Sequence, residues 1–423
     1  MRTMTLVGWL ALASAVATAG NARAQGAAVS TNLDCSVRAA GMGRSSNAVF
    51  WGGDPDYWSN PALLGYHSGV RYEYGRTQLV PDLADDVFFT TKRLTAAAYG
   101  LGFAFADKPI DGLGSIRLDY GTSQATSPTG EDLGTFSSYE DVSSWGMGLS
   151  VGRATEAIWR AAAHTSPSFL RYGDIAFGVN HKEVVLNLSP DLPGLPGIGQ
   201  GKGEADDSGL LIRLSPYNSF DGPGFSESLD RSLQLAVDVG YGASTINRGP
   251  PTVHFGDGSG YQMLEESRKG WATRVALQPV ALTREFQDHN VDWLRRSLSP
   301  AVSFGAAWDD NRLRYEGYDY LTGQPFPAES KITKSGWELG VLNVFSLRHG
   351  HISDPDGSLD GDTDGWSLGY TMDGIAGFRY DDATVPQATD PTTGISLDDV
   401  HRHAWTFFID PVRYLAVKGG DVH

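Results

Sequence analysis

The sequence predicts an all-β protein, a transmembrane antiparallel β-barrel, and three observations lead to this prediction. Large apolar residues occupy every second position in many segments, as in residues 233–241, where Gln, Ala, Asp and Gly fill the gaps. Such alternation gives a strand one lipid-facing and one lumen-facing side. After the first 24 residues, no segment approaches the roughly 20 apolar residues of a membrane-spanning helix. Finally, 52 Gly and 46 aromatic residues suit a crowded interior and interfacial girdles.

The first 24 residues predict a cleavable signal peptide. Arg2 supplies a positive start, residues 4–19 are almost all apolar or small, and Ala22-Arg23-Ala24 fits a small-x-small cleavage site before Gln25. An uncleaved anchor helix is the alternative. We expect the protein to lie outside the cytoplasm.

Charge and cysteine content exclude two classes of protein. With 33 basic and 50 acidic residues, the formal charge of −17 argues against nucleic acid as a partner. A single cysteine permits no internal disulfide, so packing and hydrogen bonds must hold the fold. A secreted soluble β protein remains an alternative to the membrane barrel, because it too can be rich in Gly and aromatic residues.

Alternation and turn residues predict about a dozen strands, with further ones hidden. The predicted ranges are 68–76, 94–106, 112–122, 143–153, 173–188, 207–215, 231–246, 270–282, 300–309, 333–348, 364–380 and 401–411. Residues 86–92 could add a strand, and 154–165 could form a strand or a short helix. We expect charged residues between the apolar ones, such as Arg71, Glu73, Arg117 and Asp119, to point into a wet lumen. A charge at the bilayer midplane on the lipid face would cost about 2–4 kcal/mol.

Two segments depart from this alternation. Residues 283–299 mix apolar and charged residues in a way that predicts a short amphipathic helix in a loop. At Asn180, His181 and Lys182 the apolar residues change from odd to even positions. A β-bulge would produce this change, and a functional break in the strand is the other interpretation.

The N-terminal part of the chain resembles a known family. Residues 39–43 (Ala-Ala-Gly-Met-Gly) and 57–64 (Tyr-Trp-Ser-Asn-Pro-Ala-Leu-Leu) are similar to the N-terminal region of the PorV/PorQ-like branch of the FadL-type outer-membrane transport proteins. Residues 177–182, 238–240, 336–350 and 363–369 are similar to later strands of that family. The C-terminus departs from the pattern, because it ends in the polar residues 418–423.

The resemblance implies a barrel of 14 strands whose N-terminal segment folds inward as a plug. The implied divisions are a signal peptide (1–24), a plug or hatch (25–66), the barrel (67–411) and a polar tail (412–423). The implied plug residues are Gly41, Met42, Gly43, Asn60, Pro61 and Ala62. Pro61 fixes its own backbone and disfavours helix at Asn60, which predicts a rigid turn. An ordinary turn leading into the first strand is the alternative to a gate.

Neither a metal site nor catalysis is strongly indicated. Asp356, Ser358, Asp360 and Asp362 place oxygens at alternate positions, as calcium loops do, but Ser367 stands where such loops carry a bidentate acid. We therefore predict a solvated acidic loop and no cofactor, with a calcium site as the alternative. No nucleophile elbow, His-Glu-x-x-His helix or phosphate loop is present, so we predict that the protein is not an enzyme.

The resemblance implies two functions for a protein of the bacterial outer membrane. The first is the binding or passage of hydrophobic small molecules, with outer-membrane lipid around the barrel. The alternative is an accessory protein of a type IX-like secretion system that binds cargo or partner subunits. The sequence does not decide between them.

Overall fold

The computed structural model describes residues 27–419 apart from several short segments. The segments outside the description are 53, 82–83, 107–113, 127–129, 131, 164–171, 189–198, 219–232, 250, 257, 280–296, 319–324 and 389–397. The predicted signal peptide and most of the predicted amphipathic helix at 283–299 therefore lie outside the described residues.

Almost all of the described chain after residue 68 is β-strand. The strands are β1 (Gly69–Gln78), β2 (Phe88–Ala98), β3 (Leu101–Ala106), β4 (Ser115–Thr126), β5 (Asp132–Ser150), β6 (Gly173–Asn187), β7 (Gln200–Asn218), β8 (Leu233–Arg248), β9 (Thr252–Phe255), β10 (Gly260–Gln262), β11 (Glu265–Pro279), β12 (Val302–Tyr318), β13 (Pro325–Val341), β14 (Phe345–Asp354), β15 (Leu359–Met372), β16 (Ala376–Val385) and β17 (Val400–Ile409). The helices are η1 (Val29–Thr31), α2 (Val37–Ala40), η2 (Pro61–Tyr66), α3 (Val151–Ala163) and α6 (Pro411–Gly419).

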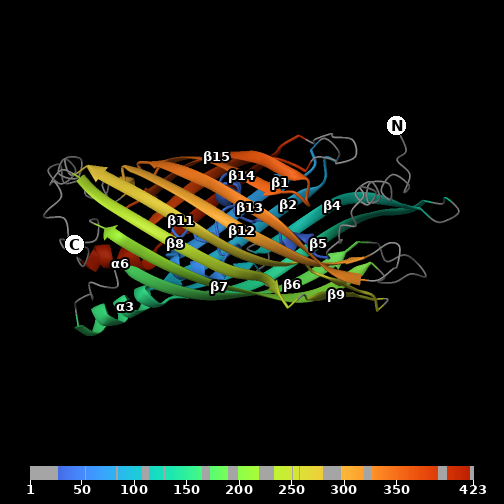
Figure 1. Ribbon diagram of the computed structural model, residues 1–423, viewed down its shortest axis with the longest axis horizontal. Helices are drawn as coiled ribbons and strands as arrows, with labels where there is room; N and C mark the ends of the chain where they lie inside the picture. The colour runs from blue at the N-terminus through green and yellow to red at the C-terminus, as the bar shows by residue number, and fades with distance from the viewer. Residues whose placement is uncertain are drawn as a thin grey trace.

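The strands form one closed antiparallel barrel (Figure 1). Closure comes from β17, which pairs with β1 along eight residues. Strands β3 and β4 share one position in the wall, since both pair with β2 and with β5. The β9–β10 hairpin extends one end of the sheet, and fourteen positions make up the wall itself. The predicted 14-stranded barrel is therefore confirmed.

Three of the predicted strands are in fact hairpins. Tight turns at residues 99–100, 342–344 and 373–375 divide the predicted ranges 94–106, 333–348 and 364–380. Tyr99 and Gly100 both have positive φ, as the centre of a tight hairpin turn requires. Because these turns are only two or three residues long, apolar alternation continues on both sides of them and hides the reversal in the sequence.

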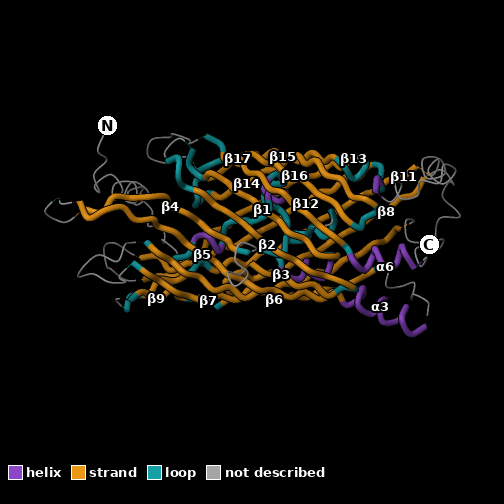
Figure 2. The backbone as a smooth tube through the Cα atoms, turned by 180° about the vertical axis from the view of Figure 1, so that it is seen from behind, coloured by secondary structure: helices purple, strands orange, loops and turns teal. Residues whose placement is uncertain are grey.

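The turns also give the orientation of the barrel. The three tight turns lie at the same end as α3 and the C-terminal helix α6 (Figure 2). The described residues of the longer connections, 79–81, 84–87, 386–388 and 398–399, lie at the other end, as does the four-residue turn 355–358. Bacterial barrels have short periplasmic turns and longer extracellular loops. We therefore assign the end with α3 and α6 to the periplasm. Of the two alternatives predicted for 154–165, a strand or a short helix, the structure has the helix, α3. Helix α6 occupies most of the predicted polar tail.

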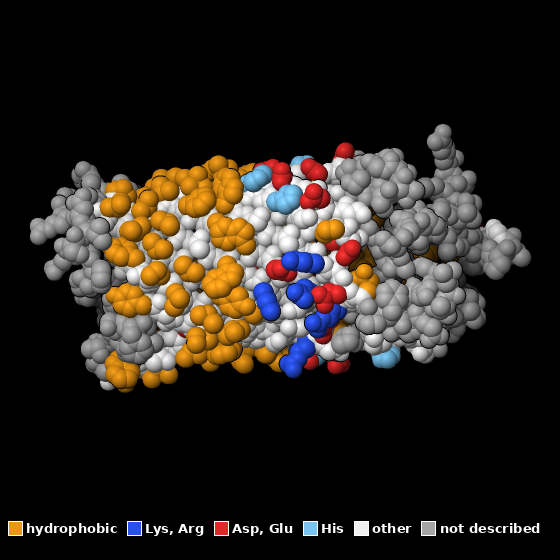
Figure 3. All heavy atoms as spheres, in the orientation of Figure 1, with side chains coloured by type: hydrophobic (Ala, Val, Ile, Leu, Met, Phe, Trp, Pro, Cys, Tyr) orange, Lys and Arg blue, Asp and Glu red, His pale blue; other side chains and the backbone are white. Residues whose placement is uncertain are grey.

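An apolar band covers the outer surface on the periplasmic side of the charged residues, on the face that Figure 3 shows. Trp145, Met147 and Leu149 of β5 point outward and are 53%, 41% and 39% exposed, as the alternation predicted. Trp271, Trp308, Trp337, Trp366 and Trp405 add large aromatic side chains to the outer surface. No helix among the described residues is long and apolar enough to cross a membrane.

On β4 the predicted orientation is wrong. Ile116 and Leu118 are buried and point inward, and Arg117 and Asp119 point outward with about a third of their side-chain surface exposed. Strand β4 lies at the extracellular end, beyond the apolar band, where the outside is water and the inside is filled by the N-terminal segment. The apolar face of a strand therefore points outward at one height in the barrel and inward at another.

Candidate functional site: plug and rim groove

Residues 27–68 lie inside the barrel, as the blue chain in Figure 1 shows. Their side chains are nearly all buried, and η2 packs against β5, β6 and β7. Tyr57, Trp58 and Leu64 join inward side chains of the wall in a hydrophobic cluster, so this segment forms part of the interior core. We call residues 27–68 the plug.

One contact between plug and wall is made by the predicted Asn60-Pro61-Ala62 turn. The Asn60 side chain accepts a hydrogen bond from the Ala62 amide at 3.1 Å and so caps η2. Its amide group donates to the carbonyl oxygens of Asn47 (2.9 Å) and of Leu210 in β7 (3.0 Å). A Cβ atom at Gly209 of β7 would overlap Oδ1 of Asn60. We call this contact the amide docking point.

A second contact involves the predicted Gly41-Met42-Gly43 segment. The Gly43 amide donates to Oγ1 of Thr363 in β15 at 2.8 Å. A Cβ atom at Gly336 of β13 would overlap the carbonyl of Met42, so the plug backbone lies directly on the backbone of the wall. Both predicted motifs therefore contact the inner wall at glycine residues, where no side chain keeps the two backbones apart.

Buried ion pairs surround this second contact. Arg38 of α2 donates to both carboxylate oxygens of Glu338 in β13, at 2.6 and 2.8 Å. Arg348 of β14 donates to the same carboxylate at 2.7 Å and to Asp381 at 3.0 Å. Each of these four side chains is less than a tenth exposed. We call the Gly41–Gly43 contact and these ion pairs the ionic docking point.

Sequence reasoning missed this ion-pair network. Alternation in residues 333–348 does place Glu338 and Arg348 opposite the apolar face, and we expected water to solvate such charges. In the structure, plug side chains take the place of that water: Arg38 pairs with Glu338, and Asp56 lies 3.6 Å from Arg93 of β2. A partner some 300 residues away leaves no signal in a single sequence.

The predicted bulge at Asn180–Lys182 is wrong. Strand β6 keeps a continuous register with β5 and with β7 from end to end. Lys182 points inward, where its ammonium group lies 2.9 Å from Asp207, 3.4 Å from the Thr31 carbonyl of the plug and 4.2 Å from the Trp58 ring centroid. The apolar residues change position because β6 leaves the apolar band here, and its inner face meets the plug.

The acidic segment at 356–362, for which a calcium site is the alternative prediction, is divided between a turn and β15. Asp360 and Asp362 of β15 lie 3.1 and 2.8 Å from the two ring nitrogens of His351, on the outer surface. Asp356 and Ser358 belong to the turn before β15. Nowhere in the described part of the chain do three His, Cys, Asp or Glu side chains form a metal-binding group.

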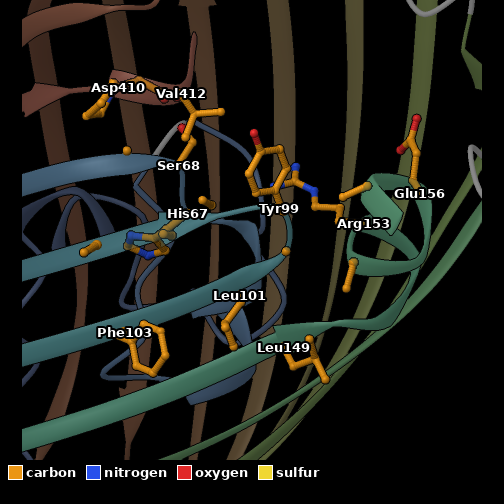
Figure 4. A pocket seen from close by; sticks show the side chains of 18 of the residues that line it. His67, Ser68, Tyr99, Leu101, Phe103, Leu149, Arg153, Glu156, Asp410 and Val412 are labelled. Atoms are coloured by element: carbon orange, nitrogen blue, oxygen red, sulfur yellow. The ribbon is translucent and has the colours of Figure 1, made fainter. Parts of the chain in front are cut away.

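A groove of about 1340 Å³ opens at the periplasmic rim (Figure 4). Most of its lining is apolar: Leu101 and Phe103 of β3 and Leu149 of β5 come from the outer surface. Helix α3 closes one side with Arg153, whose guanidinium donates to the Tyr66 carbonyl at 3.1 Å, and α6 closes another. His67, Ser68, Ala157 and Val412 also line the groove. The groove thus joins lipid-facing side chains to the end of the plug.

Two titratable groups of the plug are withdrawn from water. Burial, opposed by the Asp54 carboxylate, lowers the pKa of His67 to about 4. Its Nε2 lies 2.7 Å from the Pro55 carbonyl, which a neutral ring with a proton on Nε2 satisfies. Burial also raises the pKa of the Cys35 thiol to about 12, so this single cysteine is unreactive while the plug is in place.

Comparison with known proteins identifies fold neighbours only among solved structures. No family model and no curated protein matches the chain. The TodX deltaS2S3 mutant monoaromatic hydrocarbon channel is 12% identical, with 88% of this chain and 98% of that chain covered and a TM-score of 0.40. A Pseudomonas aeruginosa FadL homologue is 10% identical (88% and 97% covered, TM-score 0.35). The Ralstonia pickettii toluene transporter TbuX is also 10% identical (88% and 97% covered, TM-score 0.37).

At these identities and TM-scores the neighbours carry no weight in assigning the protein class. The geometry of the barrel assigns it without them. A closed antiparallel barrel with an even number of strands and an outward apolar band is the architecture of bacterial outer-membrane proteins. The protein is an outer-membrane β-barrel. The three neighbours are named as a monoaromatic hydrocarbon channel, a FadL homologue and a toluene transporter. Membership of the PorV/PorQ-like branch stays a prediction.

Proposed function

We propose that this barrel binds small hydrophobic molecules and passes them across the outer membrane. The observation that carries the proposal is the rim groove, because lipid-facing side chains and the end of the plug line the same cavity. Its size lies above the range typical of small-molecule sites, and its mainly apolar lining is typical of them. An apolar solute that passes the plug would leave through this groove.

Passage requires the plug to move, because the plug fills the lumen at both docking points. Cys35 reports such movement, since its side chain is fully buried in the resting plug. A water-soluble maleimide should therefore label Cys35 slowly at rest and faster in the presence of a transported solute. Equal labelling with and without solute would argue against a moving plug.

The groove can be tested by filling it. Ala157 of α3 lines the groove, whereas Ala162 lies on the same helix, is exposed and is not part of the lining. In vesicles containing the full chain, Ala157→Trp should lower the initial uptake rate of labelled toluene about tenfold, a barrier increase of about 1.4 kcal/mol. Ala162→Trp should leave uptake unchanged. Equal rates in both variants would overturn the groove as the route.

The alternative function, an accessory protein of a type IX-like secretion system, rests on the sequence resemblance of residues 39–43 and 57–64. It predicts stable partners in the envelope. Affinity purification of the full chain from native membranes should then recover a stoichiometric protein partner, and Ala157→Trp should not affect that recovery. Recovery of the barrel alone, together with groove-dependent uptake, would support the transport function instead.

A further inference from the structure

Basic side chains gather on one part of the outer surface, just beyond the apolar band. Figure 3 shows them on the face that β11, β12 and β13 form in Figure 1. Arg312 and Arg314 of β12 have side chains that are each 57% exposed, and Lys331 of β13 is 59% exposed. Lys269 of β11 is also exposed. We call these four residues the basic patch.

The basic patch lies at the height where lipid headgroups begin. Lys269 stands two residues before Trp271 on the same face of β11, and Trp271 pairs with Trp308 across the β11–β12 ladder. The Trp271 ring lies 4.8 Å from that of Tyr241, so aromatic side chains border the patch on its membrane side. Aromatic girdles mark the boundary between acyl chains and headgroups. Since the patch is on the extracellular side of this girdle, it faces the headgroups of the outer leaflet.

The charges of the basic patch are not fully balanced within the barrel. Arg312 lies directly opposite Lys331 in the β12–β13 ladder, and like charges in that position repel each other. Lys331 pairs with Asp310 at 2.9 Å and Arg312 with Glu329 at 3.2 Å. Arg314 contacts Glu265 at 3.2 Å and Glu329 at 3.5 Å, so three carboxylates face the four basic residues. Within the described residues, Lys269 makes no ion pair, although Asp310 stands opposite it.

The described residues of β14 and β15 offer no such surface at this height. The outward polar residues of β14 and β15 are His349 and His351, which contact Asp360, Asp362 and Asp364. The arginines of β14–β17, such as Arg348 and Arg402, point inward instead. In a chain with a formal charge of −17, the basic patch thus places four exposed cationic groups on three adjacent strands, where they can contact a lipid anion.

We propose that the basic patch binds the phosphate groups of a phosphorylated lipid of the outer leaflet. Guanidinium groups bind phosphate through two parallel hydrogen bonds, and the ammonium groups add point charge. The acyl chains of the same lipid lie against Trp271 and Trp308. A phosphate between Arg312 and Lys331 relieves the repulsion between these two side chains. This proposal does not depend on the transport function.

The test measures lipid binding by the full chain in detergent micelles, with native mass spectrometry as the readout. The probes are a bis-phosphorylated glycolipid, its dephosphorylated form and inorganic phosphate. The double variant Arg312→Gln/Lys331→Gln should bind the phosphorylated glycolipid about tenfold more weakly than the parent chain. The matched control is Arg76→Gln/Lys92→Gln, which removes two outward basic residues from β1 and β2.

We expect the parent chain and the control variant to bind the phosphorylated glycolipid and not its dephosphorylated form. The patch variant should lose this binding. Equal binding of the dephosphorylated form would overturn the proposal, because the acyl chains would then explain the affinity. Equal loss in both double variants would show a general charge effect and would also overturn it. Displacement of the lipid by millimolar inorganic phosphate would mean that the patch is a site for free phosphate. Both double variants must keep the heat-modifiable gel mobility of a folded barrel.

Discussion

The amide docking point and the ionic docking point hold the same plug by different interactions: neutral hydrogen bonds at the first and buried ion pairs at the second. At the first, Asn60 and its neighbours lie against β5–β7 and exchange hydrogen bonds between neutral groups. At the second, Gly41–Gly43 lie against β13–β15 beside the Arg38–Glu338–Arg348 ion pairs. Neutral amides cost little to bury when their hydrogen bonds are made, whereas charges lose a large hydration energy.

This difference indicates which side of the plug detaches more easily. On release, the charges of the ionic docking point regain hydration from lumen water, which offsets part of the lost attraction. The amide docking point depends on close backbone contact, which is lost entirely on separation. We expect the plug to open first along β13–β15 and to stay attached along β5–β7.

The largest effect should come from removing the shared carboxylate of the ionic docking point. Glu338→Gln leaves Arg38 without its charged partner and removes one of the two carboxylates that Arg348 contacts. Breaking a buried ion pair costs about 3–5 kcal/mol, so urea unfolding in vesicles should shift strongly and Cys35 labelling should accelerate.

The matched control for Glu338→Gln is Asp364→Asn on β15. Asp364 contacts His349 at 2.9 Å, but its side chain is 74% exposed, and surface pairs contribute about 1 kcal/mol or less. Similar destabilisation in both variants would contradict the view that burial gives the ionic docking point its energy.

Acidification should act on the amide docking point through His67, which follows η2. The folded pKa is about 4, and the unfolded pKa is near the ordinary value of about 6.5. Between these values only the unfolded chain binds the proton, so stability falls as the pH drops from about 6.5 to 4, by up to about 3 kcal/mol. Unfolding in urea at pH 7 and pH 4.5 measures this loss. His67→Gln should be less sensitive to pH, and an unchanged pH dependence would count against the assignment.

A smaller effect is expected from shape alone at the amide docking point. A Cβ atom in Gly209→Ala meets Oδ1 of Asn60, and such overpacking costs about 1–3 kcal/mol. Gly173→Ala on β6 is the control, because its new Cβ would lie 3.7 Å from the nearest atom, Cδ2 of Leu214. The Gly209 variant should lower the urea midpoint and leave its pH dependence intact. If both variants have the parent midpoint, the backbone contact does not hold the plug.

Apolar alternation predicted most of the wall but not how strands divide or which way every face points. It located β5, β8 and β11, and it gave the outward side of β5 and β8, because the predicted parts of these two strands cross the apolar band. It failed at 94–106 and 333–348, where short turns preserve the pattern through a reversal. It also failed on β4, where Ile116 and Leu118 point inward to the plug.

The motifs at 41–43 and 60–62 both contact the wall, and both stand out in the sequence for a physical reason. Gly, Asn and Pro set unusual local backbone geometry, and that requirement is visible in one sequence. The partners of these motifs, such as Gly209 and Gly336, are ordinary strand glycines until the plug is placed beside them. The groove could not be predicted at all, since α3, α6, β3 and the end of the plug meet there from distant parts of the chain.

By itself, the sequence determined that the chain forms membrane-spanning strands, because the two-residue period of a strand is a local property. Only the tertiary structure decided what each face meets, since this depends on the height of a residue in the membrane and on the position of the plug. Asn180–Lys182 illustrate the limit. Side chains there still alternate between the inner and outer sides of β6, but the apolar residues move from the outer to the inner side because the surroundings of the two sides exchange at that point.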